Sequence, residues 1–315
     1  MADTVPGYLE VRSPDFFDVI APTAELETLS VGYRWSEGPT WDRARGALYF
    51  TDVPENTAYR WRPGAGVDVF LQPSGASATE GFREPGANGL WFARDGHLLI
   101  CNHGLRRVER MNLETSQRKA LAQTFEGHRF NSPNDVVEAR DGTLYFTDPP
   151  YGLEGLDASP LKEMAENGVY RLTPGGQISR LVSDMTFPNG VALSPDETQL
   201  YVSQSDPGAP IIRALDLSSQ GEVQGDATFF DGMALLSEGL PGLPDGMAVS
   251  AQGHIFATGP GGVLVLSPEG DLLGRILTGR ATANCAFGED GSVLFITAGD
   301  RLMRLQTRVS GVQWN

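Results

Sequence analysis

The sequence is poor in cysteine and has no long apolar run. Its 315 residues include only two cysteines, Cys101 and Cys285, which lie far apart in apolar stretches and belong to no Cys-x-x-Cys pair. This pattern excludes a disulfide scaffold and favours two buried free thiols over a single disulfide. No apolar run approaches the roughly 18 residues of a membrane span, and the N-terminal stretch is acidic, unlike a signal peptide. We therefore expect a soluble, cytoplasmic protein with no membrane partner.

Basic residues are in the minority. The chain has 24 Lys and Arg against 40 Asp and Glu, a formal net charge of −16. Such a charge repels phosphate backbones and anionic membranes, which excludes nucleic acid as a partner. The chain also lacks a Gly-x-Ser-x-Gly elbow, a phosphate loop and a dinucleotide fingerprint, which argues against serine hydrolases, kinases and dehydrogenases. The Gly-rich stretch 259–262 contains Pro260 and precedes an apolar run, so it predicts a hairpin turn.

What the sequence does contain is a repeat. A polar residue, an apolar strand, a turn and a second strand recur six times at intervals of about 40 to 55 residues, close to the length of a propeller blade. The second strands read as 48–51, 98–101, 144–147, 200–203, 254–257 and 293–296. The leading polar residues are Glu37, Asn88, Asn134, Asn189, Asp245 and Asn284.

The repeat predicts an all-β, six-bladed β-propeller that occupies residues 1–315 as a single domain. A content of 38 Gly and 21 Pro suits such a turn-rich fold. Long helical periods are absent, and we expect only one short helix, around residues 159–165.

The last repeat lacks a strand at its C-terminal side. After Asn284 the sequence has strand-like runs at 293–297 and 301–306 and then little more. The apolar segment before Glu37 is the natural donor of the missing outer strand, which would close the ring and remove a free sheet edge. We expect residues 1–14 to form a loose N-terminal segment.

The leading residues of the six repeats should meet at one end of the central channel, because the first strand of each blade lines that channel. A ring of six oxygen-bearing side chains suits a hard divalent cation, with Ca²⁺ favoured, Mg²⁺ or Mn²⁺ possible and Zn²⁺ less natural without a His or Cys ligand. Each Asn-Gly or Asp-Gly also has a simpler interpretation as a turn. Glu37 weighs against that interpretation, because glutamate has no special turn chemistry.

Hydrolysis is the simplest reaction that such a cation supports. Asp245 is then either a cation ligand only or also the base that accepts a proton from water. His97, His128 and His254 lie in turns or polar loops, whereas His103 follows a strand at the channel end. His103 is therefore a second candidate catalytic residue, against the alternative of a structural histidine.

The same residues resemble the senescence-marker-protein, gluconolactonase and regucalcin-like family of six-bladed propellers. The strongest match runs from Asn131-Ser132-Pro133-Asn134-Asp135 to Asp148-Pro149-Pro150-Tyr151-Gly152, and it is similar to the bacterial and fungal gluconolactonases in particular. Supporting matches are 37–39, 103–108, 188–190, 244–246 and Asn284, so the resemblance covers about residues 35–306.

The resemblance implies hydrolysis of a small sugar lactone to its aldonic acid, with calcium or another divalent cation. It implies the cation ligands Glu37, Asn134, Asn189 and Asp245, with Asp245 as the candidate base. It implies substrate contacts at Asn88, His103, Tyr151 and Asn284. The stretch 74–86, with Glu80, Arg83 and Glu84, departs from the family pattern, so the sequence leaves the identity of the lactone open.

Two other functions compete with a lactonase. One is a phosphotriester or fluorophosphate hydrolase, in which the same cation faces a phosphoryl oxygen. The other is a non-enzymatic cation-binding propeller, because a fold does not determine a function.

Overall fold

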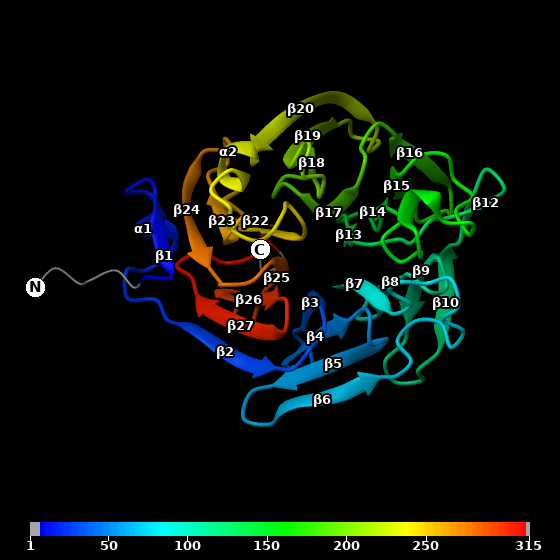
Figure 1. Ribbon diagram of the computed structural model, residues 1–315, viewed down its shortest axis with the longest axis horizontal. Helices are drawn as coiled ribbons and strands as arrows, with labels where there is room; N and C mark the ends of the chain where they lie inside the picture. Colours follow the sequence, from blue (N-terminus) through cyan, green and yellow to red (C-terminus); the bar gives the residue numbers. More distant parts are fainter. Residues whose placement is uncertain (1–6, 313–315) are drawn as a thin grey trace, which may run out of the picture.

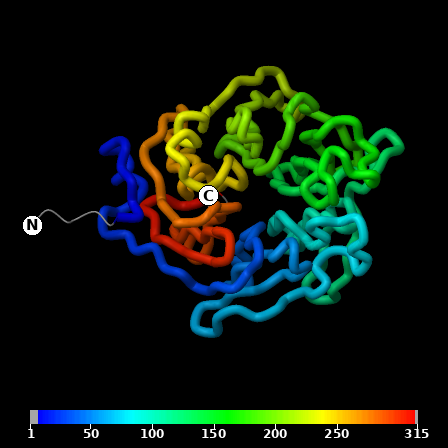
Figure 2. Tube along the Cα trace, viewed as in Figure 1, coloured from blue at the N-terminus to red at the C-terminus, as the bar shows by residue number. Residues whose placement is uncertain are grey.

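The computed structural model describes residues 7–312 and is almost entirely β. Six antiparallel sheets stand around a central axis like the blades of a propeller (Figure 1). The trace passes once around that axis, from the N-terminal segment through the successive sheets (Figure 2). The predicted six-bladed β-propeller is confirmed.

The first four blades each consist of four consecutive strands, with the first strand nearest the axis. Blade 1 contains β3 (Ser36–Asp42), β4 (Ala47–Asp52), β5 (Thr57–Arg62) and β6 (Gly66–Leu71). Blade 2 contains β7 (Ala87–Phe92), β8 (Leu98–Asn102), β9 (Arg107–Met111) and β10 (Arg118–Ala122). Blade 3 contains β13 (Val136–Glu138), β14 (Leu144–Asp148), β15 (Gly168–Leu172) and β16 (Ile178–Val182). Blade 4 contains β17 (Pro188–Leu193), β18 (Gln199–Gln204), β19 (Ile211–Leu217) and β20 (Val223–Asp231).

The last two blades each receive a strand from the N-terminal segment. Blade 6 contains β25 (Thr282–Gly288), β26 (Val293–Ala298), β27 (Arg301–Gln306) and, as its outer strand, β2 (Leu26–Val31). The pairing of β2 with β27 is antiparallel and sets Leu26 opposite Leu305. The predicted closure of the ring by the segment before Glu37 is thus confirmed.

Blade 5 has five strands, and the fifth was not predicted. It contains β21 (Met247–Val249), β22 (Ile255–Gly259), β23 (Gly262–Leu266), β24 (Leu272–Leu277) and, at its outer edge, β1 (Leu9–Val11). The buried Arg275 of β24 forms an ion pair with Glu10 of β1. The expectation of a loose segment over 1–14 is therefore wrong for β1, because this edge supplies both ladder partners and a counter-ion; residues 1–6 lie outside the described part of the chain.

The remaining elements are short. They are α1 (Phe16–Val19), the hairpin β11 (Thr124–Phe125) and β12 (His128–Arg129), a 3₁₀ turn η1 (Leu156–Ala158) and α2 (Met233–Leu236). The helix expected at 159–165 is wrong, since that stretch is irregular. Ser159 has an extended backbone, with ψ 133°. It precedes Pro160, and a residue before a proline is disfavoured in the α-helical region.

The hydrophobic core lies between neighbouring blades. At the junction of blades 6 and 1, Trp41 of β3 stacks on Phe295 of β26 with ring centroids 5.5 Å apart. Cys101 of β8 and Cys285 of β25 are both buried free thiols, as predicted. Because the blades pack side by side through such contacts, the inner strands are held in a fixed ring around the axis.

No helix in residues 7–312 combines the length and the apolar character that a membrane crossing requires.

Candidate active site

The six leading residues all lie at the start of the inner strands. Glu37, Asn88, Asn189 and Asn284 are near the beginnings of β3, β7, β17 and β25, whereas Asn134 and Asp245 stand two residues before β13 and β21. Four of these inner strands change register at this point, as shown by the shifts between Glu37 and Thr40, Ala87 and Leu90, Pro188 and Val191, and Thr282 and Asn284. Such irregularities re-aim side chains, here toward the channel.

The glycine that follows most of these polar residues has a packing role. A Cβ on Gly89 would collide with the backbone of Asn134, and one on Gly190 would collide with the backbone of Asp245. In both cases the residue that would be struck belongs to the blade after that of the glycine. The interpretation of Asn-Gly and Asp-Gly as turns is therefore wrong here, since these glycines let neighbouring inner strands approach closely.

Hydroxyl groups from neighbouring blades fix the backbone of three leading residues. The hydroxyl of Thr51 donates to Asn88 O at 3.1 Å, that of Thr147 donates to Asn189 O at 2.5 Å and that of Ser203 donates to Asp245 O at 2.6 Å. Each donor is on the second strand of the preceding blade. Blades 1, 3 and 4 thus each help to define the contribution of the next blade to the site.

Five of the six leading residues line one open cavity of about 360 Å³. Tyr151, Arg83, Glu84 and Ser205 are also in its wall. The structure therefore brings together the four residues predicted as cation ligands with two of the predicted substrate residues, Asn88 and Tyr151. The five leading residues are Glu37, Asn88, Asn134, Asn189 and Asp245.

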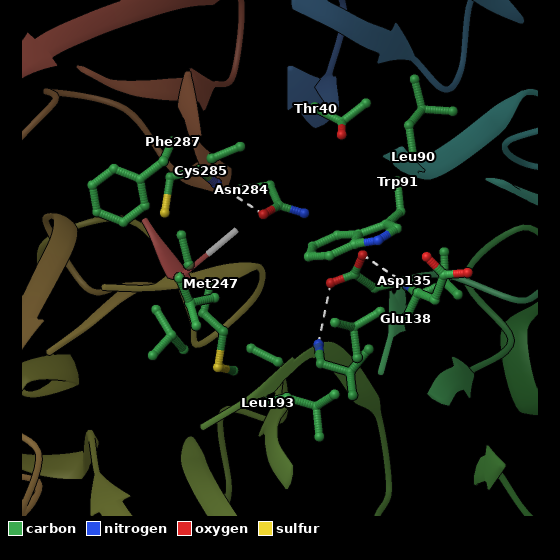
Figure 3. A pocket seen from close by; sticks show the side chains of 18 of the residues that line it. Thr40, Leu90, Trp91, Asp135, Glu138, Leu193, Met247, Asn284, Cys285 and Phe287 are labelled. Carbon is green, nitrogen blue, oxygen red and sulfur yellow. Dashed lines mark hydrogen bonds between the residues drawn. The ribbon is translucent and has the colours of Figure 1, made fainter. Parts of the chain in front are cut away.

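Asn284 faces a second cavity, farther along the inner strands. There its Oδ1 accepts the N–H of Cys285 at 2.8 Å (Figure 3). The buried carboxylate of Asp135 lies in the same inner cavity and accepts backbone N–H groups from Val136 and Val191. Because its amide also bonds with Glu37, Asn284 supports the outer site from below and does not line it.

The two carboxylates of the outer site lie in surroundings that disfavour their charge. Burial raises the pKa of Glu37 to about 8, against the lowering effect of the hydrogen bond from Gly38 N at 2.7 Å. Burial and then the charge of Glu37 raise the pKa of Asp245 well above its usual value. Two like charges in one buried site need either protons or a cation.

Two oxygen atoms of the site have no hydrogen-bond partner among the described residues: Asn189 Oδ1 and Asp245 Oδ1, both buried. The amide of Asn189 has a defined orientation, because its Nδ2 donates to Ser205 Oγ at 2.8 Å and Ser205 Oγ donates to Pro244 O at 2.5 Å. The amide oxygen is consequently the atom left free. An unpartnered buried acceptor is costly, and a bound cation would relieve that cost.

These observations fit a hard divalent cation. The donor atoms available are carboxylate and amide oxygens, the ligands that Ca²⁺ and Mg²⁺ prefer. Residues 7–312 contain no group of three or more His, Cys, Asp or Glu side chains placed to hold a metal ion. A site here would therefore depend on the amides of Asn134 and Asn189 as much as on the carboxylates of Glu37 and Asp245.

His103 lies behind the cavity wall. Its side chain is 0% exposed, and its Nε2 is 3.3 Å from Asn88 Nδ2. Burial lowers its pKa to about 3, so the ring is neutral near pH 7. Tyr151, in contrast, lines the cavity, stacks on Phe187 with ring centroids 5.6 Å apart, and has a pKa raised by burial and by Asp245.

Several residues of the cavity wall are not among the site residues that the repeat and the motifs indicate. Ser205 lies just beyond the second strand of blade 4, so its distance from a repeat opening concealed it. Arg83 and Glu84 belong to the stretch 74–86. The departure of this stretch from the family pattern was the one sequence signal that could have pointed to them. The others are Trp35, Gly242, Leu243, Ala281 and Thr282.

The sequence matches characterised relatives over most of its length. A family model described as the SMP-30/gluconolactonase/LRE-like region matches residues 35–300. The gluconolactonase of Zymomonas mobilis is 41% identical over 312 residues, which cover 97% of this chain and 87% of that protein. The pentonolactonase XacC of Haloferax volcanii is 26% identical over 269 residues, which cover 84% of this chain and 81% of that protein.

Solved structures agree with these matches. A gluconolactonase from Xanthomonas campestris superposes with a TM-score of 0.82 at 33% identity, covering 95% of this chain and 94% of that one. The calcium-binding protein regucalcin from Agrobacterium tumefaciens shares the fold, with a TM-score of 0.72 at 21% identity and coverage of 91% and 95%. The family suggested by the sequence motifs is thereby confirmed, and the chain belongs to the SMP-30/gluconolactonase/LRE-like family.

Proposed function

We propose that this protein hydrolyses a sugar lactone to its aldonic acid, using one divalent cation held by Glu37, Asn134, Asn189 and Asp245. The observation that carries the proposal is the pair of unpartnered, buried oxygens, Asn189 Oδ1 and Asp245 Oδ1, in the wall of one cavity with Glu37. The names of the relatives support the substrate class, because they include a gluconolactonase and a pentonolactonase.

Calcium is the proposed cation. The site offers only oxygen ligands on separate blades, a mixed set of carboxylates and amides that suits the flexible coordination of Ca²⁺. A structural relative of the same fold is described as a calcium-binding protein. Mg²⁺ and Mn²⁺ are the alternatives, and Zn²⁺ suits this donor set less well.

The chain's own residues supply the rest of the chemistry. When bound, the cation would polarise the lactone carbonyl and help to orient water. Asp245 accepts a proton from the water molecule while the water oxygen forms a bond to the carbonyl carbon. Breakage of the ring C–O bond then requires a proton on the departing ring oxygen, and Asp245 returns the one it accepted. The reaction consumes one water and leaves a hydroxyl and a carboxylic acid, which ionises at neutral pH.

The cavity wall contains both an aromatic surface and a polar ion pair. Tyr151 supplies a rigid aromatic wall through its stacking on Phe187. Arg83 is the one cationic side chain among the described residues that line the cavity, and it is paired with Glu84 at 2.9 Å. An Arg–Glu pair offers donors and acceptors without net charge, which suits the hydroxyl groups of a neutral sugar lactone.

The proposal is tested by pH-stat hydrolysis of glucono-1,5-lactone and several pentonolactones. The protein is stripped with chelator and then refilled with calcium, magnesium, manganese or zinc. Turnover that disappears on stripping and returns with one cation is the expected result. Folded, cation-loaded protein that turns over no lactone would contradict the proposal.

The same preparation distinguishes the competing functions. A phosphotriester and a fluorophosphate substrate are measured alongside the lactones. A much larger rate on either one would favour a phosphotriester or fluorophosphate hydrolase, in which the cation faces a phosphoryl oxygen. Cation binding without turnover of any substrate would favour a non-enzymatic propeller.

A further inference from the structure

His103 lies in an enclosed position between two residues of the cavity wall. On one side Asn88 Nδ2 is 3.3 Å from Nε2 of the ring, and on the other side Glu84 Oε2 is 3.9 Å from Nδ1. The backbone of Gly152 packs so closely on the ring that a Cβ at residue 152 would collide with it. His103 therefore has no route to the substrate, although it contacts a residue that has one.

The Asn88 amide has its Nδ2 toward the ring, and this orientation is compatible with only one neutral tautomer of His103. An amide Nδ2 can only donate, so Nε2 of His103 must accept and must be unprotonated. In a neutral imidazole the proton is then on Nδ1. Burial lowers the pKa of His103 to about 3, which agrees with a neutral ring. Nδ1 has no hydrogen-bond partner among the described residues, and the charged group that faces it is the carboxylate of Glu84, 3.9 Å away.

Glu84 is itself held in place. Its backbone N–H and that of Arg83 both donate to Gly152 O, at 3.3 Å and 3.0 Å. Its side chain is 12% exposed and forms an ion pair with Arg83. The segment that contains Glu84 connects β6 to β7 and is bonded to the loop after β14. It presents a carboxylate to the Nδ1 side of the His103 ring.

We propose that His103 is a positioning residue in a Glu84–His103–Asn88 chain, in which the Nδ1-protonated ring fixes the Asn88 amide with its Oδ1 turned into the cavity. The kinetic consequences of this role rest on the proposed lactonase function, but the arrangement itself does not. With Oδ1 toward the cavity, Asn88 presents an acceptor, which suits a hydroxyl group of a polyhydroxylated substrate. With the proton on Nε2 instead, the Asn88 amide would be reversed and would present its Nδ2 donor to the cavity.

The direct test is ¹⁵N NMR of the imidazole rings in the cation-loaded protein. The chain has only four histidines, and the His103 signals are assigned by their loss in His103→Gln. The expected spectrum has a protonated Nδ1 and an unprotonated Nε2, unchanged between about pH 6 and about pH 8, where an ordinary histidine titrates. A protonated Nε2, or a ring that gains a second proton in this range, would overturn the inference.

The role of Glu84 is tested in the same spectrum. Glu84→Gln replaces an obligate acceptor with a side chain that can also donate, so the population of the Nδ1-protonated form should fall. Identical His103 signals in Glu84→Gln and in the wild type would remove Glu84 from the chain.

Kinetics separate positioning from simple packing. The side-chain oxygen of His103→Gln can still accept from Asn88, so this variant should retain most of its kcat/KM. His103→Leu cannot accept, and it should lose about tenfold or more, the size usual for a lost outer-shell partner. Equal kcat/KM in His103→Leu and the wild type, or an equal loss in both variants, would contradict the inference.

A surface pair provides the matched control. His97 Nε2 is 3.4 Å from Asn112 Nδ2, away from the cavity, so His97→Leu should leave kcat/KM unchanged. Circular dichroism checks that each variant is folded. Should the wild type turn over no lactone, the proposed function fails, and the NMR spectrum alone decides on the tautomer and on Glu84.

Discussion

The charge of Asp245 is the single feature on which the proposed chemistry depends most. Asp245→Asn keeps the shape of the side chain but removes both a negative ligand and the proposed proton acceptor. Because burial and Glu37 already disfavour the charge of Asp245, the fold of the variant should be retained. We expect weaker cation binding and a loss of at least about 100-fold in kcat, the lower end for a lost acid–base group.

Calorimetric cation titration, initial rates at saturating cation and a circular-dichroism melt measure these three quantities. Wild-type kcat in Asp245→Asn at saturating cation would remove Asp245 from the proton transfer and leave it, at most, a ligand. An unfolded variant would show instead that this residue is needed for the fold.

Ser205 acts on the site through the amide of Asn189. Its hydroxyl accepts from Asn189 Nδ2 and donates to Pro244 O, which leaves Asn189 Oδ1 free. In Ser205→Ala the amide can rotate, so we expect cation affinity to fall by about 10- to 100-fold while kcat at saturating cation stays near that of the wild type. Cation titration followed by rate measurement checks both expectations.

Ser194→Ala is the matched control. Ser194 is a buried serine of the same blade, but its hydroxyl donates to Asp196 in the turn between β17 and β18, away from the cation site. Its cation affinity should be that of the wild type. An equal loss of affinity in the two variants would indicate a general effect on blade 4.

At the scale of secondary-structure elements, the two N-terminal strands should differ in importance. The strand β2 completes blade 6 and joins the chain's beginning to its end, whereas β1 adds a fifth strand to a blade that already has four. Deleting residues 1–31 should therefore abolish cooperative unfolding, and deleting residues 1–12 should lower the melting temperature by only several degrees. Thermal melts of both truncated proteins and of the full chain make the comparison.

The 1–12 deletion is the control for losing an N-terminal strand that is not needed to complete a four-stranded blade. Cooperative melting of the 1–31 deletion near the wild-type temperature would show that blade 6 does not need its outer strand.

The repeat could be predicted from sequence because its packing has a local signature. Each Gly after a leading residue, such as Gly89, lies against the next inner strand, and this contact recurs from blade to blade. The positions of Glu37, Asn134, Asn189 and Asp245 in one wall follow from that repetition. Properties set by repetition are visible along the chain.

Contacts that occur once could not be predicted in this way. The pairing of β1 with β24 joins Glu10 to Arg275 across 265 positions, with no repeated pattern to reveal it. The approach of Glu84 to His103 depends on the path of one irregular segment, and Asn284 faces the inner cavity, where its Oδ1 accepts the N–H of Cys285. Such details depend on tertiary packing.

At the scale of the whole molecule, the cost of burying carboxylates should make stability depend on pH. Burial raises the pKa of Glu37 to about 8 and the pKa values of Asp135 and Asp148 to about 7. The folded protein without cation therefore keeps protons that the unfolded chain releases above about pH 4. Its free energy of unfolding should fall as the pH rises from about 4 to about 8, and level off above that.

A bound cation should remove part of this dependence. It interacts with the ionised forms of Glu37 and Asp245, so its binding strengthens as their protons leave, and it stabilises the folded state by mass action. We expect the difference in melting temperature between loaded and stripped protein to widen from pH 6 to pH 8, the span around the raised pKa values near 7 and 8. Asp148→Asn is the control: Asp148 is absent from the cavity wall, so this variant should flatten the pH dependence of both forms and leave their difference intact. A difference that narrows with rising pH would show that the stabilising cation does not bind these carboxylates.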